Sequence, residues 1–115
     1  MNSQPSESPE ISAHWTALLP LADLPTDGTG ATVEVPGYRL AVFHVDGELR
    51  VLDDECPHAG ASLGAGVCLD GDVTCPWHGW HFRLSDGSNT DGLSERVAVH
   101  PARVNDAGVV EATLA

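Results

Sequence analysis

Lysine is absent from this chain, and its positive charge comes from only five arginines. Aspartate and glutamate together number 17, so the formal net charge is -12 with histidine neutral. Such an acidic surface repels phosphate backbones and anionic lipid. We therefore expect no nucleic-acid or membrane partner, and favour encounter with a basic protein face. The alternative interpretation is an acidic surface that only keeps the protein soluble.

Cysteine is also scarce, with three residues. If Cys56 and Cys75 belong to one metal site, Cys68 is left without a partner and no intrachain disulfide framework can form. A reducing compartment, the cytoplasm, is then expected. Residues 1–10 contain neither a basic residue nor an apolar run. They predict a disordered tail, not a signal peptide or a membrane anchor.

No long amphipathic helix and no internal repeat is evident, whereas 12 glycines and 8 prolines separate short valine-rich runs. This pattern predicts an all-β fold in one domain, residues 11–115, too short to include a separate catalytic domain. A single helical turn is expected at residues 21–24. The expected strands are residues 15–18, 31–35, 39–45, 48–53, 72–75, 80–84, 96–101 and 109–113.

Two short motifs carry the chemistry: Cys56-Pro57-His58 and Cys75-Pro76-Trp77-His78. They offer two thiolates and two imidazoles on separate loops, within a segment of about residues 54–84. This ligand set fits a Rieske 2Fe-2S cluster, in which two histidines replace two cysteines on one iron, and it implies one-electron transfer. A structural zinc site is the alternative, but zinc sites usually pair Cys-x-x-Cys, and the first pair here is Cys-x-His.

The surrounding residues strengthen this interpretation. CPHAGASLG at residues 56–64 and CPWHGWHF at residues 75–82 resemble the two cluster loops of the Rieske superfamily, in particular its soluble ferredoxins. The resemblance implies an antiparallel β-sandwich or barrel base with an inserted cluster-binding subdomain at about residues 54–84. It also implies that the four motif residues hold one 2Fe-2S cluster. Cys56 and Cys75 would bind one iron, and His58 and His78 the other.

The resemblance also assigns roles to residues around the ligands. Gly64 and Gly79 would let the backbone approach the inorganic sulfides and donate N-H groups to them; the alternative, an ordinary turn glycine, applies more to Gly64 than to Gly79. Trp80 is expected to fill the core of the subdomain. Trp77 either shields the cluster or contacts a partner protein.

The remaining histidines and Cys68 have simpler interpretations. His81 is expected in a strand, half-buried or at the surface and pointing away from the cluster. His14, His44 and His100 are expected to be packing residues, not ligands. Cys68 is expected to be a small apolar residue with little reactivity.

The sequence contains no glycine-rich nucleotide fingerprint, no flavin-binding pattern and no triad of two histidines and a carboxylate for mononuclear iron. The chain is therefore expected to carry electrons between proteins and not to catalyse a reaction alone. The resemblance implies a flavin-dependent reductase as electron donor and a ring-hydroxylating oxygenase as acceptor.

Two other functions remain open. Residues 96–104 and 40–43, with the overall length, resemble the small subunit of NADH-dependent nitrite reductase, which would make the chain a fixed partner of the large subunit. Many such small subunits lack cluster ligands, and this chain has all four, which favours a redox carrier. A structural or redox-sensing module is a third possibility, but the chain has no output domain and no basic DNA-binding surface.

We predict a low reduction potential, near about -150 mV. In the high-potential branch of the superfamily, two extra cysteines form a disulfide between the loops, and Ala61 and Trp77 occupy those positions here. Hydroxyl groups near the cluster in that branch align with Trp80 and Phe82, which cannot donate an O-H. Voltammetry at neutral pH measures the potential directly, and a value well above zero would contradict the prediction.

Overall fold

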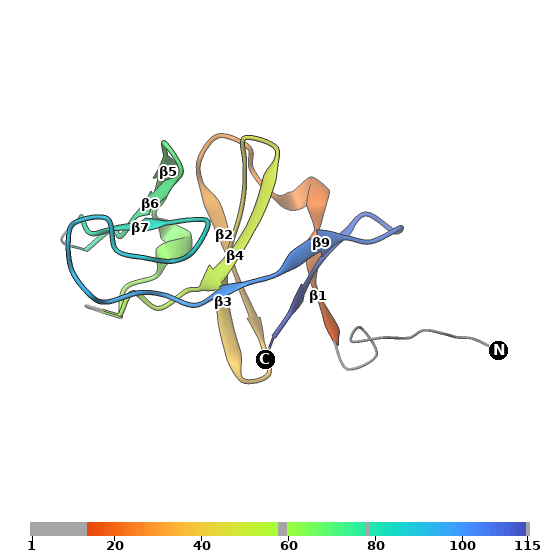
Figure 1. The fold of residues 1–115 in the computed structure, drawn as a ribbon. Helices are drawn as coiled ribbons and strands as arrows, with labels where there is room; N and C mark the ends of the chain where they lie inside the picture. Colours follow the sequence, from red (N-terminus) through yellow and green to blue (C-terminus); the bar gives the residue numbers. More distant parts are fainter. Residues whose placement is uncertain (1–13, 58–59, 78, 115) are drawn as a thin grey trace.

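The fold consists of antiparallel sheets, seen here in a computed structural model that describes residues 14–57, 60–77 and 79–114 (Figure 1). Across this described part of the chain, the helical elements are two short 3-10 turns, η2 (Leu21–Asp23) and η3 (Leu63–Ala65). None of its helices is long and apolar enough to cross a membrane. The predicted all-β class is confirmed, as is the turn near residue 21, while the expected tail at residues 1–10 lies outside the described residues.

The strands form three sheets, none of which closes on itself within the described residues. The first contains β1 (Trp15–Pro20), β10 (Val109–Thr113) and β9 (Ala102–Val104), in that order. The second contains β2 (Gly30–Val35), β3 (Tyr38–Val45), β4 (Glu48–Asp53) and β8 (Val99–His100). The third contains β5 (Val67–Leu69), β6 (Asp72–Thr74) and β7 (His81–Arg83). We call the first two sheets the base.

Strands β3 and β4 form the hairpin that the Asp46-Gly47 pair indicates. Val45 pairs with Glu48 across the turn. Asp46 and Gly47 have φ values of 53° and 75°. Positive φ at both central positions is what a type I′ turn requires, and such turns match the twist of the flanking strands.

Strand β3 is buried on both faces because its side chains alternate between two cores. Leu40 and Val42 face the core of the base, together with residues of β4 and β10. Ala41 and Phe43 face a second core, which also includes Cys56 and Cys75. We call this second core the loop core. All four β3 side chains are fully buried, so the strand lies in the interior of the protein.

The third sheet lies at one end of the molecule, beside the base (Figure 1). In the chain it is inserted between β4 and β8. Its edge strand β5 also contacts the segment before β2, because Thr29 forms a bridge with Val67 and the Cys68 N-H donates to the Gly28 carbonyl at 2.7 Å. The inserted segment is therefore attached to the base along its edge as well as through the chain.

The single strand expected at residues 96–101 is wrong in its extent. Only Val99–His100 pairs with β4, and the chain then passes Pro101 and enters β9, which belongs to the other base sheet. Proline has no N-H to donate to a ladder, so a continuous strand through this position is disfavoured. Strand β5, with only three residues, was not anticipated because three residues carry no recognisable alternation.

Replacing Phe43 by alanine should destabilise the protein strongly. The side chain is fully buried in the loop core, and such truncations typically cost about 3–5 kcal/mol. Urea unfolding measures the change. Leu69→Ala is the control because Leu69 is 72% exposed, and it should change stability by less than about 0.5 kcal/mol. Equal effects in the two variants would contradict the assignment of this core.

Candidate metal centre

The first cysteine loop, residues 54–64, follows β4 and folds back on itself. Glu55 forms an antiparallel bridge with Ser62, and the Cys56 N-H donates to the Ala61 carbonyl at 2.8 Å. The Gly60 N-H donates to the Cys56 carbonyl, also at 2.8 Å. The backbone of Cys56 is thus held from both sides, and its side chain is fully buried.

The second cysteine loop, residues 75–80, connects β6 to β7. The Cys75 N-H donates to the Trp80 carbonyl at 2.7 Å, which closes the loop. Gly79 has a φ of 69°, a backbone conformation that favours glycine over other residues. Because β6 ends at Thr74, Cys75 lies at the start of the loop and not in the strand, and it is 1% exposed.

The two cysteine side chains meet in the loop core. The Cys56 thiol is a hydrogen-bond partner of Cys75, although 18 residues separate them in the chain. Burial, and to a smaller extent the neighbouring Cys56 thiol, raise the pKa of Cys75 to about 11. The Trp77 backbone N-H hydrogen-bonds to Cys75 and acts in the opposite direction. Without a metal ion, the Cys75 thiol therefore keeps its proton at neutral pH.

This arrangement fits an iron-sulfur centre. Two thiols presented side by side from separate loops in a water-excluded core can bind one iron as thiolates, and iron binding would release the proton that burial retains on Cys75. His58 and His78, the expected imidazole ligands, lie outside the described residues. Among the residues that are described, no group of three or more His, Cys, Asp or Glu side chains could hold a further metal ion.

The glycine and tryptophan residues expected around the ligands have distinct environments. The Gly64 N-H donates to the Asp54 carboxylate at 2.7 Å, so this N-H has a different acceptor from the sulfide that we expected. Trp80 is partly buried against the loop core, with its ring centroid 6.4 Å from that of Phe82. Trp77 is 60% exposed.

The other histidines do not join the cysteine pair. His81, on β7, is partly exposed, and its Nδ1 lies 3.1 Å from a carboxylate oxygen of Asp91. His100 lies edge-on to Tyr38 and its Nε2 is 2.8 Å from Asp53. His44 is partly buried at the end of β3.

One residue of the site was missed by the sequence analysis. Asp54, two residues before Cys56, is fully buried and accepts hydrogen bonds from both the base and the first cysteine loop. An acidic residue directly after an apolar strand was a possible signal. Its partner Arg39 is 15 residues away, however, and nothing in the sequence pairs the two.

Comparison with known proteins identifies the family. The model of the Rieske [2Fe-2S] domain matches residues 14–101. The chain belongs to this family. A Rieske-type 2Fe-2S cluster is accordingly its cofactor, in agreement with the two thiols that meet in the loop core.

Curated relatives of this Rieske domain include much longer proteins. Cholesterol 7-desaturase of Xenopus laevis is 43% identical over 65 residues, which are 55% of this chain but only 14% of the desaturase. The chain thus spans about a seventh of that relative's length. The likeness covers the Rieske domain and carries no information about the rest of the desaturase.

Solved structures of small Rieske proteins match nearly the whole chain. A Mycobacterium tuberculosis protein described as an NADH-dependent nitrite reductase small subunit is 28% identical, with a TM-score of 0.82 over 90% of this chain and 96% of that one. The ferredoxin of Sphingomonas yanoikuyae B1 is also 28% identical, with a TM-score of 0.79 over 89% and 100%. A chain from the complex of oxygenase and ferredoxin in carbazole 1,9a-dioxygenase is 27% identical, with a TM-score of 0.76 over 86% and 92%.

Cys68 generates a prediction about alkaline pH. Burial raises the pKa of this thiol from an ordinary value of 9.0 to about 12, so the folded protein holds the proton more tightly than the unfolded chain does. Its contribution to stability is complete below about pH 9 and is lost as the pH rises toward 12. Cys68→Ala should therefore lose less stability than the wild type in urea unfolding as the pH rises above about 9.

The comparison is internally controlled, because Cys75 contributes equally to both proteins when they are measured in the same metal state. Since Cys68 is only about half buried, the difference should be small. Parallel pH profiles in the two proteins would contradict the prediction.

Proposed function

We propose that this Rieske domain is a one-electron carrier that accepts electrons from a flavin-dependent reductase and passes them to an oxygenase-type acceptor. The observation that carries the proposal is the pair of buried thiols, Cys56 and Cys75, brought together from two loops. We assign them to one iron, and His58 and His78 to the other. When bound, the cluster supplies a reversible one-electron couple.

The described residues suit such a carrier in two ways. The fully buried positions of Cys56 and Cys75 keep water from the sulfur ligands. The Trp77 backbone N-H donates toward Cys75 and would stabilise its thiolate, while Trp77 as a whole is 60% exposed. An exposed aromatic residue beside a redox centre is a suitable contact for a partner protein, which favours the contact interpretation of Trp77 over shielding.

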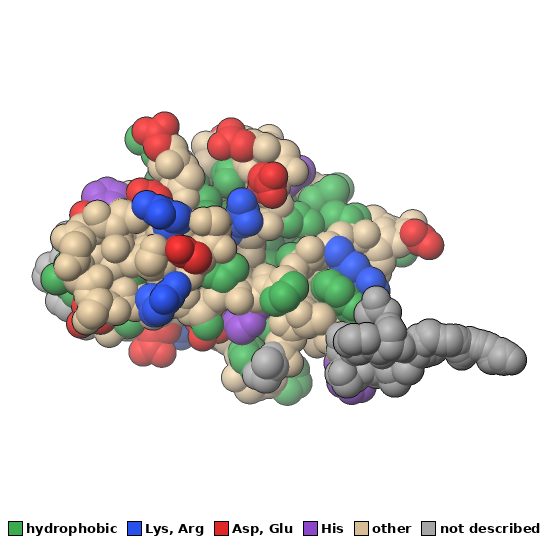
Figure 2. Space-filling view, viewed as in Figure 1, with side chains coloured by type: hydrophobic (Ala, Val, Ile, Leu, Met, Phe, Trp, Pro, Cys, Tyr) green, Lys and Arg blue, Asp and Glu red, His purple; other side chains and the backbone are tan. Residues whose placement is uncertain are grey.

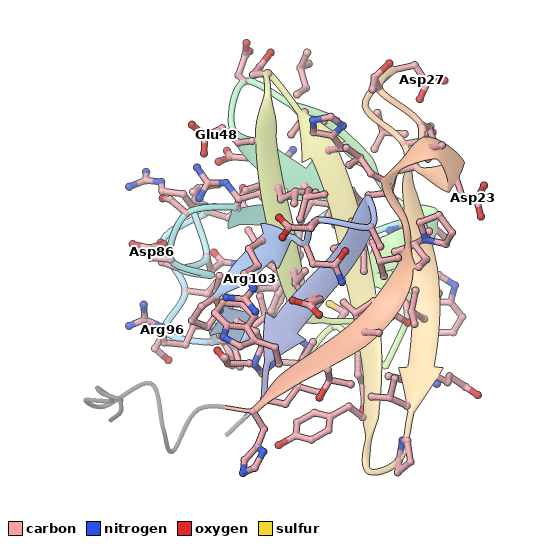
Figure 3. All side chains as sticks on the ribbon, turned by 90° about the vertical axis from the view of Figure 1, so that its right-hand side faces the viewer. Asp23, Asp27, Glu48, Asp86, Arg96 and Arg103 are labelled. Carbon is pink, nitrogen blue, oxygen red and sulfur yellow. The ribbon has the colours of Figure 1, made fainter. Side chains whose placement is uncertain are left out.

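The distribution of charge supports encounter with a basic partner. Acidic side chains project from several sides of the molecule, with Asp23 and Asp27 on one side of the base and Glu48 and Asp86 on another (Figure 3). On the face shown in Figure 2, arginine side chains lie among acidic ones and do not form a continuous basic area. Net charge of this kind attracts a basic partner over a distance, and contacts near the loops would then orient it.

A second candidate is the small subunit of a nitrite reductase. The likeness to the Mycobacterium tuberculosis protein, with a TM-score of 0.82, supports it. Both candidates place the same cluster in the same fold and differ in the partner and in the lifetime of the complex. A structural or redox-sensing module is the third, and it predicts electron exchange too slow for turnover.

Anaerobic mixing distinguishes the three functions. The reduced protein is mixed with an oxidised Rieske oxygenase and, separately, with a nitrite reductase large subunit, and cluster reoxidation is followed by absorbance. Fast reoxidation by the oxygenase that slows as salt is added supports the proposed carrier. A stable stoichiometric complex with the large subunit supports the second candidate. Slow electron exchange with both proteins would support the structural or redox-sensing module.

The ligand assignment predicts that His78→Cys either abolishes the cluster or shifts the potential strongly negative, because a thiolate replaces a neutral imidazole. The visible and electron paramagnetic resonance spectra before and after dithionite measure both effects. His81→Cys is the matched control, since His81 pairs with Asp91, and it should keep the wild-type spectrum. An unchanged spectrum and potential in His78→Cys would refute the assignment.

A further inference from the structure

Among the described residues, Asp54 is the one charged residue that is fully buried. Burying a carboxylate costs several kcal/mol unless hydrogen-bond donors and opposite charge surround it. Asp54 lies between β4 and the first cysteine loop, so its hydrogen-bond partners show how this loop is attached to the base.

Four donors surround the Asp54 carboxylate. Its Oδ1 accepts from the Gly64 N-H at 2.7 Å, the Ser62 hydroxyl at 2.9 Å and the Thr32 hydroxyl at 3.3 Å. Its Oδ2 accepts from Arg39 Nε at 2.9 Å. Two donors belong to the base, on β2 and β3, and two belong to the first cysteine loop. One side chain therefore connects the loop to both base strands.

The backbone of Asp54 forms the same connection. Its N-H donates to the Arg39 carbonyl at 2.9 Å, and its carbonyl accepts from the Leu63 N-H at 2.7 Å. The fit around the carboxylate is close, because a Cβ placed on Gly64 would lie 2.9 Å from Asp54 Oδ1 and would clash with the Thr32 hydroxyl. Glycine at position 64 thus allows the loop backbone to reach the carboxylate.

The second cysteine loop is supported differently. Cys75 follows β6, whose Val73 and Thr74 pair with β7, and its N-H donates to Trp80 within the loop. None of the four donors to the Asp54 side chain comes from this loop. A change at Asp54 should therefore displace one cysteine loop relative to the other.

We propose that Asp54 is a positioning residue for Cys56: it fixes the first cysteine loop on the base and so sets the placement of the Cys56 thiol relative to that of Cys75. Through this placement it controls cluster retention and reduction potential. The proposal rests on the proposed function, because it takes Cys56 and Cys75 as cluster ligands.

The first test is Asp54→Asn in the cluster-containing protein. Asparagine keeps the shape but presents an NH₂ group either to Arg39 or to the other three donors, which leaves a donor without an acceptor. Hydrogen exchange followed by mass spectrometry should show about 10- to 100-fold faster exchange in peptides covering residues 55–64. In the molecules that retain the cluster, peptides covering residues 72–83 should be unchanged; in the whole preparation, cluster content should fall and the midpoint potential should shift.

A matched control and a rescue make the test specific. Asp86→Asn is the control, because Asp86 also accepts hydrogen bonds from a backbone N-H and a hydroxyl, both of Ser88, but in an exposed turn. The rescue adds Arg39→Gln to Asp54→Asn. A glutamine carbonyl oxygen stands as far along the side chain as arginine Nε and can accept from the asparagine NH₂. The double variant should regain slow exchange at residues 55–64, cluster content and the wild-type potential.

Three results would overturn the proposal. One is equal acceleration of exchange in all peptides of Asp54→Asn, which would mean that Asp54 contributes only to global stability. The second is unchanged exchange and potential in that variant, and the third is recovery of stability in the double variant without recovery of the potential. Cys56→Ala separates the ligand assignment from the anchoring of the loop: if this variant keeps the cluster, the ligand assignment fails, whereas the exchange data on Asp54→Asn still test the anchoring of the loop.

Discussion

Burial of β3 on both faces is the constraint on which the rest of the structure depends. Leu40 and Val42 complete the core of the base, whereas Ala41 and Phe43 complete the loop core that contains both cysteines. A change that destabilises β3 would therefore destabilise both the base and the site. Because side chains alternate along a strand, a shift of one residue in its register would exchange the two sets and disrupt both cores.

Burial of the two cysteines has two effects at the site. Burial that holds the Cys56 and Cys75 thiols together also raises the pKa of Cys75, so the free Cys75 thiol resists ionisation. With the ligands we propose, iron binding would overcome this penalty by replacing the Cys75 proton. Folding of the loop core and assembly of the cluster would then be coupled through proton release.

Much of the base could be predicted from the sequence because its signals are local. The strands at residues 31–35, 39–45 and 48–53 follow from apolar alternation and from the Asp46-Gly47 turn, and the structure places them within one residue of these bounds. Prediction failed where tertiary pairing decides the outcome. The three-residue β5 exists because β6 and the Gly28 carbonyl pair with it, and β8 and β9 separate because they join different sheets.

The same division holds at the site. The sequence by itself determined which chemistry to expect at the centre: the types and spacing of the two Cys-His motifs predict a ligand set, since these donors suit few metal centres. Only the tertiary structure decided how the cysteines are held. The contact between Asp54 and Arg39, and the use of the Gly64 N-H by that carboxylate, depend on side chains that the folding of separate strands brings together. Local sequence patterns do not encode such contacts, because their partners are distant in the chain.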